Sequence, residues 1–551
     1  MTRYARSIRI LMAGVACTAL ASCDGADNVA SPGAGSVVVV TPPPAPVPTA
    51  TPTGTPTPAA ITAAQFASTS GQARTDGQTF AITADEQLAV VNAGTNNQVS
   101  GTNILNGVYP NSATAATAAT TPGNPSTLNA FFTATNYVGA LNGPTDASFQ
   151  GWTCNSSSAQ FGGTSVSCAN VPAVGAGGAT AVCPTGTTDD GLVATFRVCR
   201  LTTTDGVIRS SLTLPRIPGV VYRFRGQTEI GQDVGTTGAD SGVTLTIEAG
   251  VTLVADSSEA TTDLIIVNRG SRINAVGTAT NPIIFTSQQN LTANNVGDAT
   301  QGQWGGIILL GQAPTAVCAS GTGPNNAAGT STTCQQAIEG VTSRFYGGPD
   351  AADNSGTMSF VQIRFTGVAL ADGNEVQGLT LGGVGTGTTL DHIQSHNSAD
   401  DGIEIFGGTA NIRYFAVTGA DDDGFDIDNG YRGFIQFMIA AQKPSGATND
   451  SFATEIDSNL NEDLLPRTYG RYANFTFIQT ATAPAAIRLR GGADMTFVNG
   501  IVRTPTGVAC VNLIAQEVGA ADRSTVRAAD QARQDIGAPQ FNSVYFACQG
   551  R

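Results

Sequence analysis

A repeat of about 22 residues in the second half of the chain constrains its fold more than any other feature. The motif Asp-Asp-Gly-Ile-Glu-Ile at 400–405 returns as Asp-Asp-Gly-Phe-Asp-Ile at 422–427, and weaker copies occupy 378–383, 453–457 and 486–491. A second short β-like segment follows each copy. Two strands with glycine turns are too few for a four-stranded propeller blade, but they suit one coil of a β-solenoid. The repeat therefore predicts parallel coils stacked about 4.8 Å apart.

Side chains of a strand point alternately to its two faces, which divides each repeat into inward and outward positions. The positions predicted to face the interior are Ile403, Ile405, Phe425, Ile427, Ile456 and Leu489. The positions between them are predicted to form one outward column of Glu404, Asp426, Glu455 and Arg488. The repeat thus predicts a hydrophobic core and a line of charged side chains along one face.

The domain organisation follows from where the repeat begins and where it is interrupted. It predicts an all-β fold, a parallel β-helix over 216–551, with insertions near 312–340 and 441–470. A stretch rich in Ala, Arg, Asp and Gln at 514–536 predicts a short helical excursion near the C-terminus. Residues 61–215 are predicted to form an irregular, β-rich, disulfide-stapled N-terminal cap, because the end of a solenoid must be covered.

The N-terminus has the features of an export signal. Three arginines precede an apolar run at 10–19 that is too short to cross a bilayer as a helix. The run ends in Leu-Ala-Ser-Cys at 20–23, which resembles the lipobox of bacterial lipoproteins. The resemblance implies a signal peptide over 1–23, cleavage before Cys23 and a lipid anchor on its sulfur.

Residues 24–60 are rich in Pro, Thr and Ala, a composition typical of an extended linker. We therefore expect a protein anchored in the cell envelope and held away from the membrane by this linker. The outer membrane or the cell surface is expected in preference to the inner membrane, which Asp24 favours in enterobacterial lipoproteins.

Eight cysteines follow Cys23, and an even number in an exported protein indicates disulfides. The predicted pairs are Cys318–Cys334, which closes a polar loop, and Cys510–Cys548, which closes a later excursion. The connectivity of the other four cysteines is left open: Cys154, Cys168, Cys183 and Cys199.

Nine carboxylates gather on the predicted outward column and at the turns beside it. They are Asp400, Asp401, Glu404, Asp422, Asp423, Asp426, Asp428, Glu455 and Asp457. Stacking Glu404 over Asp426 places like charges about 5 Å apart, which costs roughly 3 kcal/mol at an effective dielectric of 20. A hard cation would neutralise them, and Ca²⁺ binds about six to eight oxygen atoms. The sequence predicts a Ca²⁺ site, with the alternative that these acids only satisfy backbone donors at turns and keep the surface soluble.

Several further segments carry a family resemblance. They are Gln-Trp-Gly-Gly-Ile-Ile-Leu-Leu-Gly at 303–311, Ile-Glu-Gly at 338–340, Tyr-Gly-Gly at 346–348 and Asp-Asn-Ser-Gly at 353–356. Together with the Asp-Asp-Gly motifs they resemble a largely uncharacterised family of exported, right-handed parallel β-helix proteins. The resemblance covers about 216–510 and implies a right-handed coil and a location outside the cytoplasm. It implies no established activity.

The segment 400–405 also resembles the Asp-Asp-x-Ile-x-Ile segment of polygalacturonase-type glycosidases, although the Gly-His-Gly motif of those enzymes is missing. This resemblance implies Asp400, Asp401 and Glu404 as the acid and base of a glycoside hydrolase. Arg488 and Arg490, which lie where those enzymes carry Arg-Ile-Lys, are the candidate bases of a uronate lyase.

The only histidines, His392 and His396, are expected on the surface. Their spacing along one strand, about 13 Å, is too wide for both to bind one metal ion.

We expect a binding or scaffold module of the cell envelope that acts through its acidic face, with calcium as a possible cofactor. Two alternatives stay open: a polysaccharide-active enzyme on the same face, and an accessory subunit of an outer-membrane transporter or secretion system. The expected partners are the membrane, through Cys23, and a polysaccharide or an outer-membrane protein. Nucleic acid is excluded as a partner because 26 basic and 41 acidic residues leave a net charge of −15.

Overall fold

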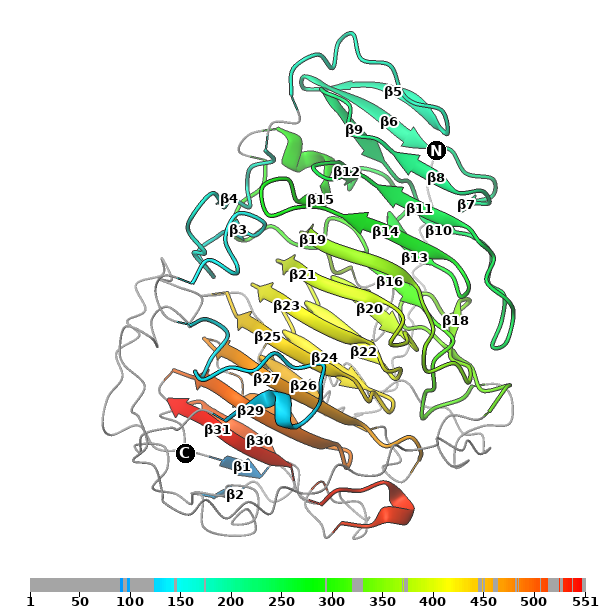
Figure 1. Cartoon of the computed structure of the whole chain (residues 1–551). Helices are drawn as coiled ribbons and strands as arrows, with labels where there is room; N and C mark the ends of the chain where they lie inside the picture. Colours follow the sequence, from blue (N-terminus) through cyan, green and yellow to red (C-terminus); the bar gives the residue numbers. More distant parts are fainter. Residues whose placement is uncertain are drawn as a thin grey trace, which may run out of the picture.

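The computed structural model describes residues 123–547 with gaps, together with the strands at 90–92 and 97–99. The gaps are 143–145, 173–174, 293–294, 320–330, 369, 371–374, 444–447, 449–450, 459–463, 481–482, 484, 506, 514–524, 526–528 and 538. The described chain winds into a stack of coils (Figure 1). The signal peptide, Cys23 and the linker 24–60 lie outside the described residues. No helix in the described part is long and apolar enough to cross a membrane.

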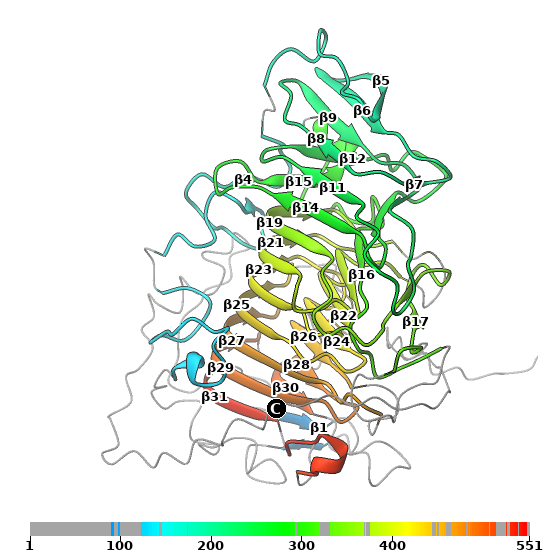
Figure 2. The same cartoon turned by 45° about the vertical axis from the view of Figure 1, so that its right-hand side comes forward.

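One strand of each coil belongs to a 12-stranded sheet, called sheet one, whose strands from β7 to β30 descend the stack in chain order (Figure 2). Its strands are β7 (Val207–Ile208), β10 (Gln227–Ile230), β13 (Leu264–Val267), β16 (Ile307–Leu310), β20 (Leu379–Gly382), β22 (Ile403–Phe406), β24 (Phe425–Asp428), β26 (Thr454–Ile456), β28 (Ala485–Leu489) and β30 (Ala509–Leu513). At the last coil, β1 (Val90–Asn92) pairs in parallel with β30 and in antiparallel with β2 (Asn97–Val99).

The second ladder, sheet two, has 15 strands, of which 12 form its main path. They are β5 (Thr187–Val193), β6 (Phe196–Leu201), β9 (Val220–Arg223), β12 (Thr252–Ala255), β15 (Ile283–Ser287), β19 (Gly356–Arg364), β21 (Thr389–His396), β23 (Asn411–Thr418), β25 (Phe434–Ala441), β27 (Tyr469–Ile478), β29 (Asp494–Arg503) and β31 (Gln540–Ala547), joined by β8 (Leu212–Leu214), β11 (Thr244–Ile247) and β14 (Arg272–Val276). The parallel pairing confirms the predicted parallel β-helix.

The core lies between the sheets and is built from the positions that the repeat predicts. Ile405 pairs in register with Ile427, which pairs with Ile456 and then with Leu489. All four side chains are buried in the largest hydrophobic cluster, together with Ile403. Burying each of these side chains contributes about 1.5–3 kcal/mol, so stacking the coils is strongly favoured.

A single residue with positive φ bends each long strand of sheet two. In the first coils two separate strands fill this place, since β14 pairs with the start of β19 and β15 with its end. From β19 onward the two are fused, and the bend residue has φ between +51° and +63°. The bend residues are Phe360, His392, Tyr414, Phe437, Asn474, Asn499 and Ser543. The first four stack as rings 4.3–4.5 Å apart, which helps to hold a conformation that is unfavourable for any residue with a Cβ.

Residues 123–170 lie along the flank of sheet two, whereas the sequence predicted them over the first coil. Trp152 packs there against the ring ladder, and Figure 1 shows the cyan segment crossing β27 and β29. Side-chain amides from the coils bind its backbone: Gln436 bonds both the N–H and the C=O of Thr133, at 2.8 and 2.9 Å. These partners are 303 residues apart, so no local pattern indicates the contact. At the first coil itself lies the antiparallel hairpin β5–β6.

The interruptions of the repeat are observed, although they differ in kind. The insertion near 312–340 leaves sheet one after β16 and contains the start of a hairpin, β17 (Gln336–Ala337) with β18 (Phe345–Tyr346). The stretch 441–470 contains β26, which continues sheet one. Most of the predicted helical excursion, 514–524 and 526–528, lies outside the described residues, and the described part of 514–536 contains one 3-10 turn, η3 (Gln531–Arg533). Two others are η1 (Pro125–Thr127) and η2 (Gln288–Leu291), and β3 (Cys154–Asn155) pairs with β4 (Val166–Ser167).

The predicted disulfide Cys318–Cys334 is confirmed. The connectivity that the sequence left open is Cys154–Cys168 and Cys183–Cys199. Cys510 is disulfide-bonded, and its predicted partner Cys548 lies outside the described residues.

Candidate metal centre

The predicted charged column exists on the outer face of sheet one. Glu404 on β22 pairs in register with Asp426 on β24, which pairs with Glu455 on β26 and then with Arg488 on β28. Neighbouring parallel strands lie about 4.8 Å apart, so the carboxylates are stacked as expected.

The column is buried, although the sequence predicted it to face solvent. Glu404 is 2% exposed, Asp426 and Glu455 are each 7% exposed, and Arg488 is 8% exposed. The acids are therefore not solubilising groups of an exposed face, and their burial needs a physical explanation.

The insertion after β16 folds over this face of sheet one. Its backbone is joined to the coils by hydrogen bonds from Gly408 N–H to Pro314 O and from Ala316 N–H to Asn429 O, both 2.7 Å long. The buried Tyr346 lies close to Phe406, with ring centroids 6.1 Å apart. Arg344 from the same insertion binds Glu229 of β10, with Nε 2.9 Å from Oε2. The insertion is thus bound to several coils and helps to cover the outer face.

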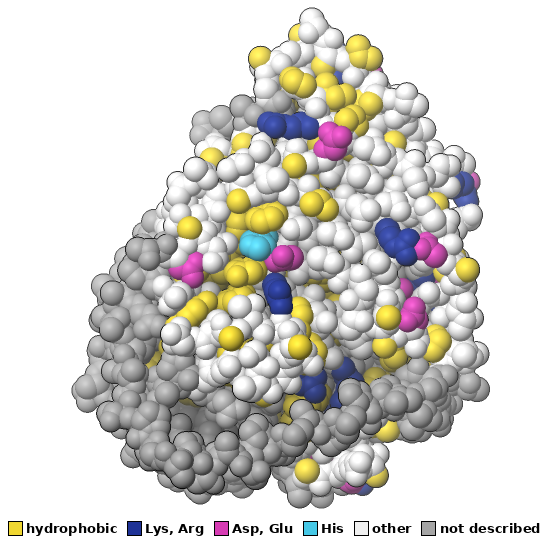
Figure 3. Space-filling model, viewed as in Figure 1, with side chains coloured by type: hydrophobic (Ala, Val, Ile, Leu, Met, Phe, Trp, Pro, Cys, Tyr) yellow, Lys and Arg dark blue, Asp and Glu magenta, His cyan; other side chains and the backbone are white. Residues whose placement is uncertain are grey.

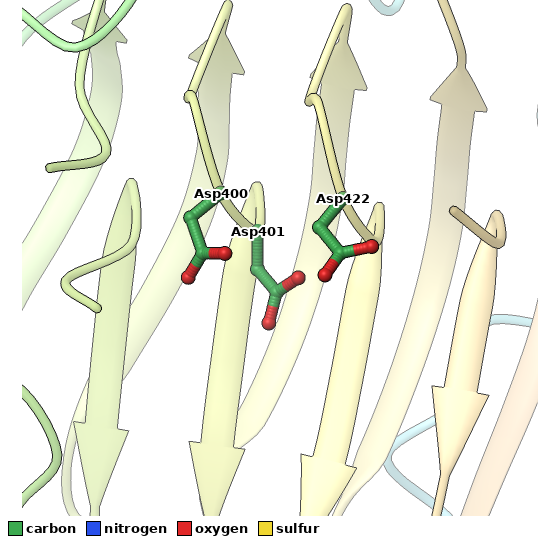
Figure 4. A group of neighbouring side chains, drawn as sticks. All are labelled: Asp400, Asp401 and Asp422. Atoms are coloured by element: carbon green, nitrogen blue, oxygen red, sulfur yellow. The ribbon is translucent and has the colours of Figure 1, made fainter. Parts of the chain in front are cut away.

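Two overlapping groups of carboxylates have oxygen atoms within 4.8 Å of one another. The first consists of Asp400, Asp401 and Asp422, at the turns that precede β22 and β24 (Figure 4). The second consists of Asp401, Glu404 and Asp426, all buried. In the second group, Oε2 of Glu404 and Oδ1 of Asp426 are buried and accept no hydrogen bond in the described part of the chain. Buried oxygens without a donor are costly, so a cation that neutralised their charge would stabilise this group.

Burial raises the pKa of Asp401, Glu404 and Asp426 well above the ordinary range. Neighbouring negative charges raise them further: Asp400 acts on Asp401, Glu339 on Glu404, and Asp428 on Asp426. Burial, followed by the charge of Glu375, also raises the pKa of Asp400 to about 7. Without a cation these groups must share protons, because the ionised forms repel one another in a buried site.

The turn aspartates also have the structural role that the alternative interpretation predicts. Asp401 Oδ1 accepts a hydrogen bond of 2.8 Å from the backbone N–H of Asp423. Asp423 Oδ1 accepts one of 2.5 Å from the N–H of Phe452. Each aspartate thereby links its coil to the next, and one carboxylate oxygen of Asp401 also lies within 4.8 Å of oxygens of Glu404 and Asp426.

The far end of the column is neutralised by arginines. Arg488 Nη1 lies 3.2 Å from Glu455 Oε2, and Arg490 Nε lies 2.7 Å from Glu455 Oε1 and 3.3 Å from Asp457 Oδ2. Of the nine predicted metal ligands, Glu455 and Asp457 are therefore ion-paired. Both candidate lyase bases, Arg488 and Arg490, are buried and bind these carboxylates.

The sequence did not predict one acid that lies near the carboxylates of the candidate metal centre. Glu339 comes from the insertion, and burial followed by the charge of Asp400 raises its pKa well above the ordinary range. Its Ile-Glu-Gly context matches no repeat, so no pattern in the sequence indicates that it approaches Glu404.

One histidine is buried, contrary to expectation, whereas His392 is partly exposed at the surface, with 18% of its side chain exposed. His396 is 1% exposed, and its Nδ1 lies 2.9 Å from Thr418 Oγ1. His392 is stacked between Phe360 and Tyr414 at 4.3 Å from each. The positive φ of His392 interrupts the strand alternation on which the expectation rested.

The comparisons with known proteins agree with this architecture. Residues 229–537 match the family model described as a pectate-lyase like β-helix domain. No curated protein and no solved structure matches the chain. Because the family model covers more than half of the sequence and its span coincides with the stacked coils, the chain belongs to the family of pectate-lyase like β-helix domains.

Proposed function

We propose that the protein is a non-catalytic binding or scaffold module of the cell envelope, whose coils around 400–428 are held together by a buried Ca²⁺ ion. The observation that carries this proposal is the group Asp401, Glu404 and Asp426, with oxygens within 4.8 Å of one another and two buried oxygens that accept no hydrogen bond from the described residues. A cation there would replace proton sharing by direct coordination and would link two successive coils.

The ligand chemistry favours calcium over softer metals. Both carboxylate groups offer oxygen atoms only, without histidine or cysteine. Such ligand sets suit Ca²⁺, Mg²⁺ or Mn²⁺, and Ca²⁺ tolerates irregular geometry, whereas Mg²⁺ demands a near-ideal octahedron. The ligands come from one turn and from two different strands, β22 and β24, and such a mixed set suits the tolerant geometry of Ca²⁺ best.

Burial supports binding rather than catalysis at this face. A glycosidase needs its two carboxyl groups on either side of an accessible sugar linkage, whereas Glu404 is 2% exposed and Asp401 is 6% exposed. A lyase base must be free to take a proton from the sugar, whereas Arg490 binds Glu455 and Asp457. The same groups suit an ion that enters during folding.

Calorimetry and thermal unfolding of the 61–551 fragment test the proposal. We expect heat on titration with Ca²⁺ after chelation, and a melting temperature that rises with the concentration of free Ca²⁺. Asp426→Asn should abolish the calcium-dependent rise, whereas the matched control Asp205→Asn, an exposed aspartate outside the centre, should retain it. Absence of heat together with an unchanged melting temperature would contradict the calcium site. Release of reducing ends or unsaturated uronates from a polysaccharide panel would contradict the non-catalytic assignment.

The location in the cell envelope rests on the lipobox-like segment that ends at Cys23. We expect the full-length protein to incorporate labelled fatty acid and to fractionate with membranes, whereas Cys23→Ser should do neither. Membrane fractionation of the Cys23→Ser protein would contradict an anchor at this cysteine.

A further inference from the structure

Three arginines and three aromatic rings form a strip on the flank of sheet two, on a different sheet from the acidic centre. We call it the arginine–aromatic strip, and its members are Arg413, Arg432, Arg471, Phe131, Phe434 and Tyr469. All six side chains are partly exposed. Figure 3 shows this flank, where apolar side chains gather in the middle and the charged side chains are few and scattered.

The strip is continuous because each ring contacts an arginine or another ring. The guanidinium carbon of Arg413 lies 4.4 Å from the ring centre of Phe131, which stacks on Phe434 at 5.9 Å. The guanidinium of Arg471 lies 5.0 Å from Phe434 and 3.6 Å from Tyr469. Arg432 approaches the other side of the strip, 5.8 Å from the ring centre of Tyr469. Contacts between cations and ring faces restrict how the guanidinium groups move, so the strip is preorganised.

The strip lacks the counterions that other surface arginines have. Arg197, Arg200 and Arg272 each form an ion pair with an aspartate. Among the described residues, none of the three strip arginines pairs with a carboxylate. Arg413 donates to the backbone oxygen of Phe131, and Arg432 donates to Arg467 O and Gln534 Oε1.

Two acids beside the strip form no ion pair with its arginines in the described part of the chain. Asp391, opposite Arg413 in the register of β21 and β23, has its Oδ1 atom 2.6 Å from Nδ1 of His392. Asp494 is buried and accepts a hydrogen bond from Ile536 N–H. Burial followed by the charge of Asp535 raises the pKa of Asp494 to about 9, which leaves it neutral at neutral pH. Three cations thus lie together without ion-paired acids in a chain whose net charge is −15.

We propose that the arginine–aromatic strip binds an anionic polysaccharide through carboxylate groups on its sugars. A planar guanidinium donates two parallel hydrogen bonds to a carboxylate, and a fixed guanidinium loses little entropy when it does so. Arg413 and Arg471 lie on strands two coils apart, on the order of 10 Å along the stack, so one linear chain can contact both. The partly exposed rings offer apolar surface to the hydrophobic faces of sugars.

Charge complementarity also decides between classes of partner. The net charge of −15 opposes approach to an anionic bilayer or to nucleic acid, whose charge densities are high. A uronate-containing glycan has a lower charge density, because neutral sugar atoms separate its carboxylates. A single glycan chain can also contact the strip without contacting the rest of the acidic surface. This inference rests on the proposed binding function and names its ligand class, but it does not depend on the calcium centre.

The test compares two double variants of equal net charge, Arg413→Gln/Arg471→Gln in the strip and Arg197→Gln/Arg272→Gln in ion pairs near the first coils. Alginate, a linear polyuronate, is the probe, and neutral dextran is the control, in calcium-free buffer so that alginate does not gel. We expect wild type to bind alginate and not dextran, with affinity that falls as salt rises. Affinity should fall at least tenfold in the strip variant and less than twofold in the other, with both melting temperatures near that of wild type.

Three results would overturn the inference: no binding of alginate by wild type, an equal loss in both variants, or binding of dextran equal to that of alginate. Vesicles containing phosphatidylglycerol form a further arm, and vesicle binding that is lost in the strip variant would instead assign the strip to a membrane. Calcium titration reports on the proposed centre alone. A protein that binds alginate at the strip without responding to calcium would contradict the centre and leave the strip intact.

Discussion

At the residue scale, Gly382 determines whether the insertion after β16, which covers the outer face of sheet one, can lie against that face. A Cβ at this position would lie 2.8 Å from the ring of Tyr346, closer than van der Waals contact allows. Gly382 stands in register with Phe406, and burial and nearby charges, including those of Asp428 and Glu404, raise the pKa of Tyr346. The absence of a side chain at this position of β20 therefore allows Tyr346 to pack against sheet one beside Phe406.

Gly382→Ala should lower the free energy of unfolding by about 1–3 kcal/mol, because Tyr346 or the strand must move. It should also weaken Ca²⁺ binding through displacement of the cover. Urea unfolding and calcium titration measure the two effects. The matched control is Gly297→Ala, at an exposed glycine with nothing within 4 Å of the new Cβ, and it should change stability by less than 1 kcal/mol. Equal effects of the two substitutions would contradict the assigned role of Gly382.

His396 provides a pH-dependent contribution to stability. Burial, together with the charge of Arg364, lowers the pKa of His396 to about 3 from 6.5. Below about pH 6.5 the unfolded chain binds a proton that the folded chain does not, so the free energy of unfolding falls as the pH falls from 6.5 towards 3, by about 1.4 kcal/mol per unit. His396→Gln lacks this contribution. Between pH 7 and pH 5, wild type should therefore lose about 2 kcal/mol more than the variant in urea titrations, and identical losses would contradict this assignment.

At the element scale, the ladder of bend residues and the amide side chains beside it attach the segment 123–170 to the coils. Gln362 donates to Trp152 O at 2.6 Å, Gln394 to Cys154 O at 3.0 Å, and Asn499 to Gly123 O at 2.8 Å. Each coil therefore supplies a separate attachment, so loss of one amide should release part of the segment without unfolding the stack.

Gln436→Leu removes both hydrogen bonds to Thr133 and leaves its N–H and C=O without these partners, at a cost of about 1–3 kcal/mol per unsatisfied group. We expect faster proteolytic cleavage near 133 while the coils stay protected. The exposed control Gln232→Leu should be cleaved at the wild-type rate. Simultaneous loss of protection in the coils of the Gln436→Leu protein would show that the segment and the stack unfold together.

The elements whose positions follow from the repeat could be predicted from the sequence. The register of Glu404 with Asp426, and of Ile405 with Ile427, follows from the repeat because identical positions of successive coils become neighbours. The burial of the column could not be predicted, because its cover comes from a non-repetitive insertion. The approach of Glu339 to the centre and the position of the segment 123–170 were not predicted for the same reason. Both depend on contacts between residues distant in the sequence, and a periodic pattern does not indicate such contacts.

At the scale of the whole molecule, the outer column of sheet one changes character along the stack. In register it contains Glu229, Ile266, Ile308, Thr380, Glu404, Asp426, Glu455, Arg488 and Asn512. At the top, Glu229 is ion-paired with Arg344, and below it Ile266 and Ile308 pack in one cluster with Ile338 and Val341 of the insertion. The lower part is neutralised by arginines. Only the middle of the column, Glu404 and Asp426, has buried carboxylates that no arginine pairs with in the described part of the chain. The calcium proposal therefore concerns the one stretch of the column that neither apolar packing nor ion pairing accounts for.

The most direct test is a crystal structure of the 61–551 fragment grown with calcium, with anomalous differences recorded at a wavelength where calcium scatters. The account predicts one strong anomalous peak bonded to oxygens of Asp401, Glu404 and Asp426 at about 2.3–2.6 Å. An empty centre whose carboxyl groups are hydrogen-bonded to one another would contradict it, because the buried acids would then be stabilised by protons alone.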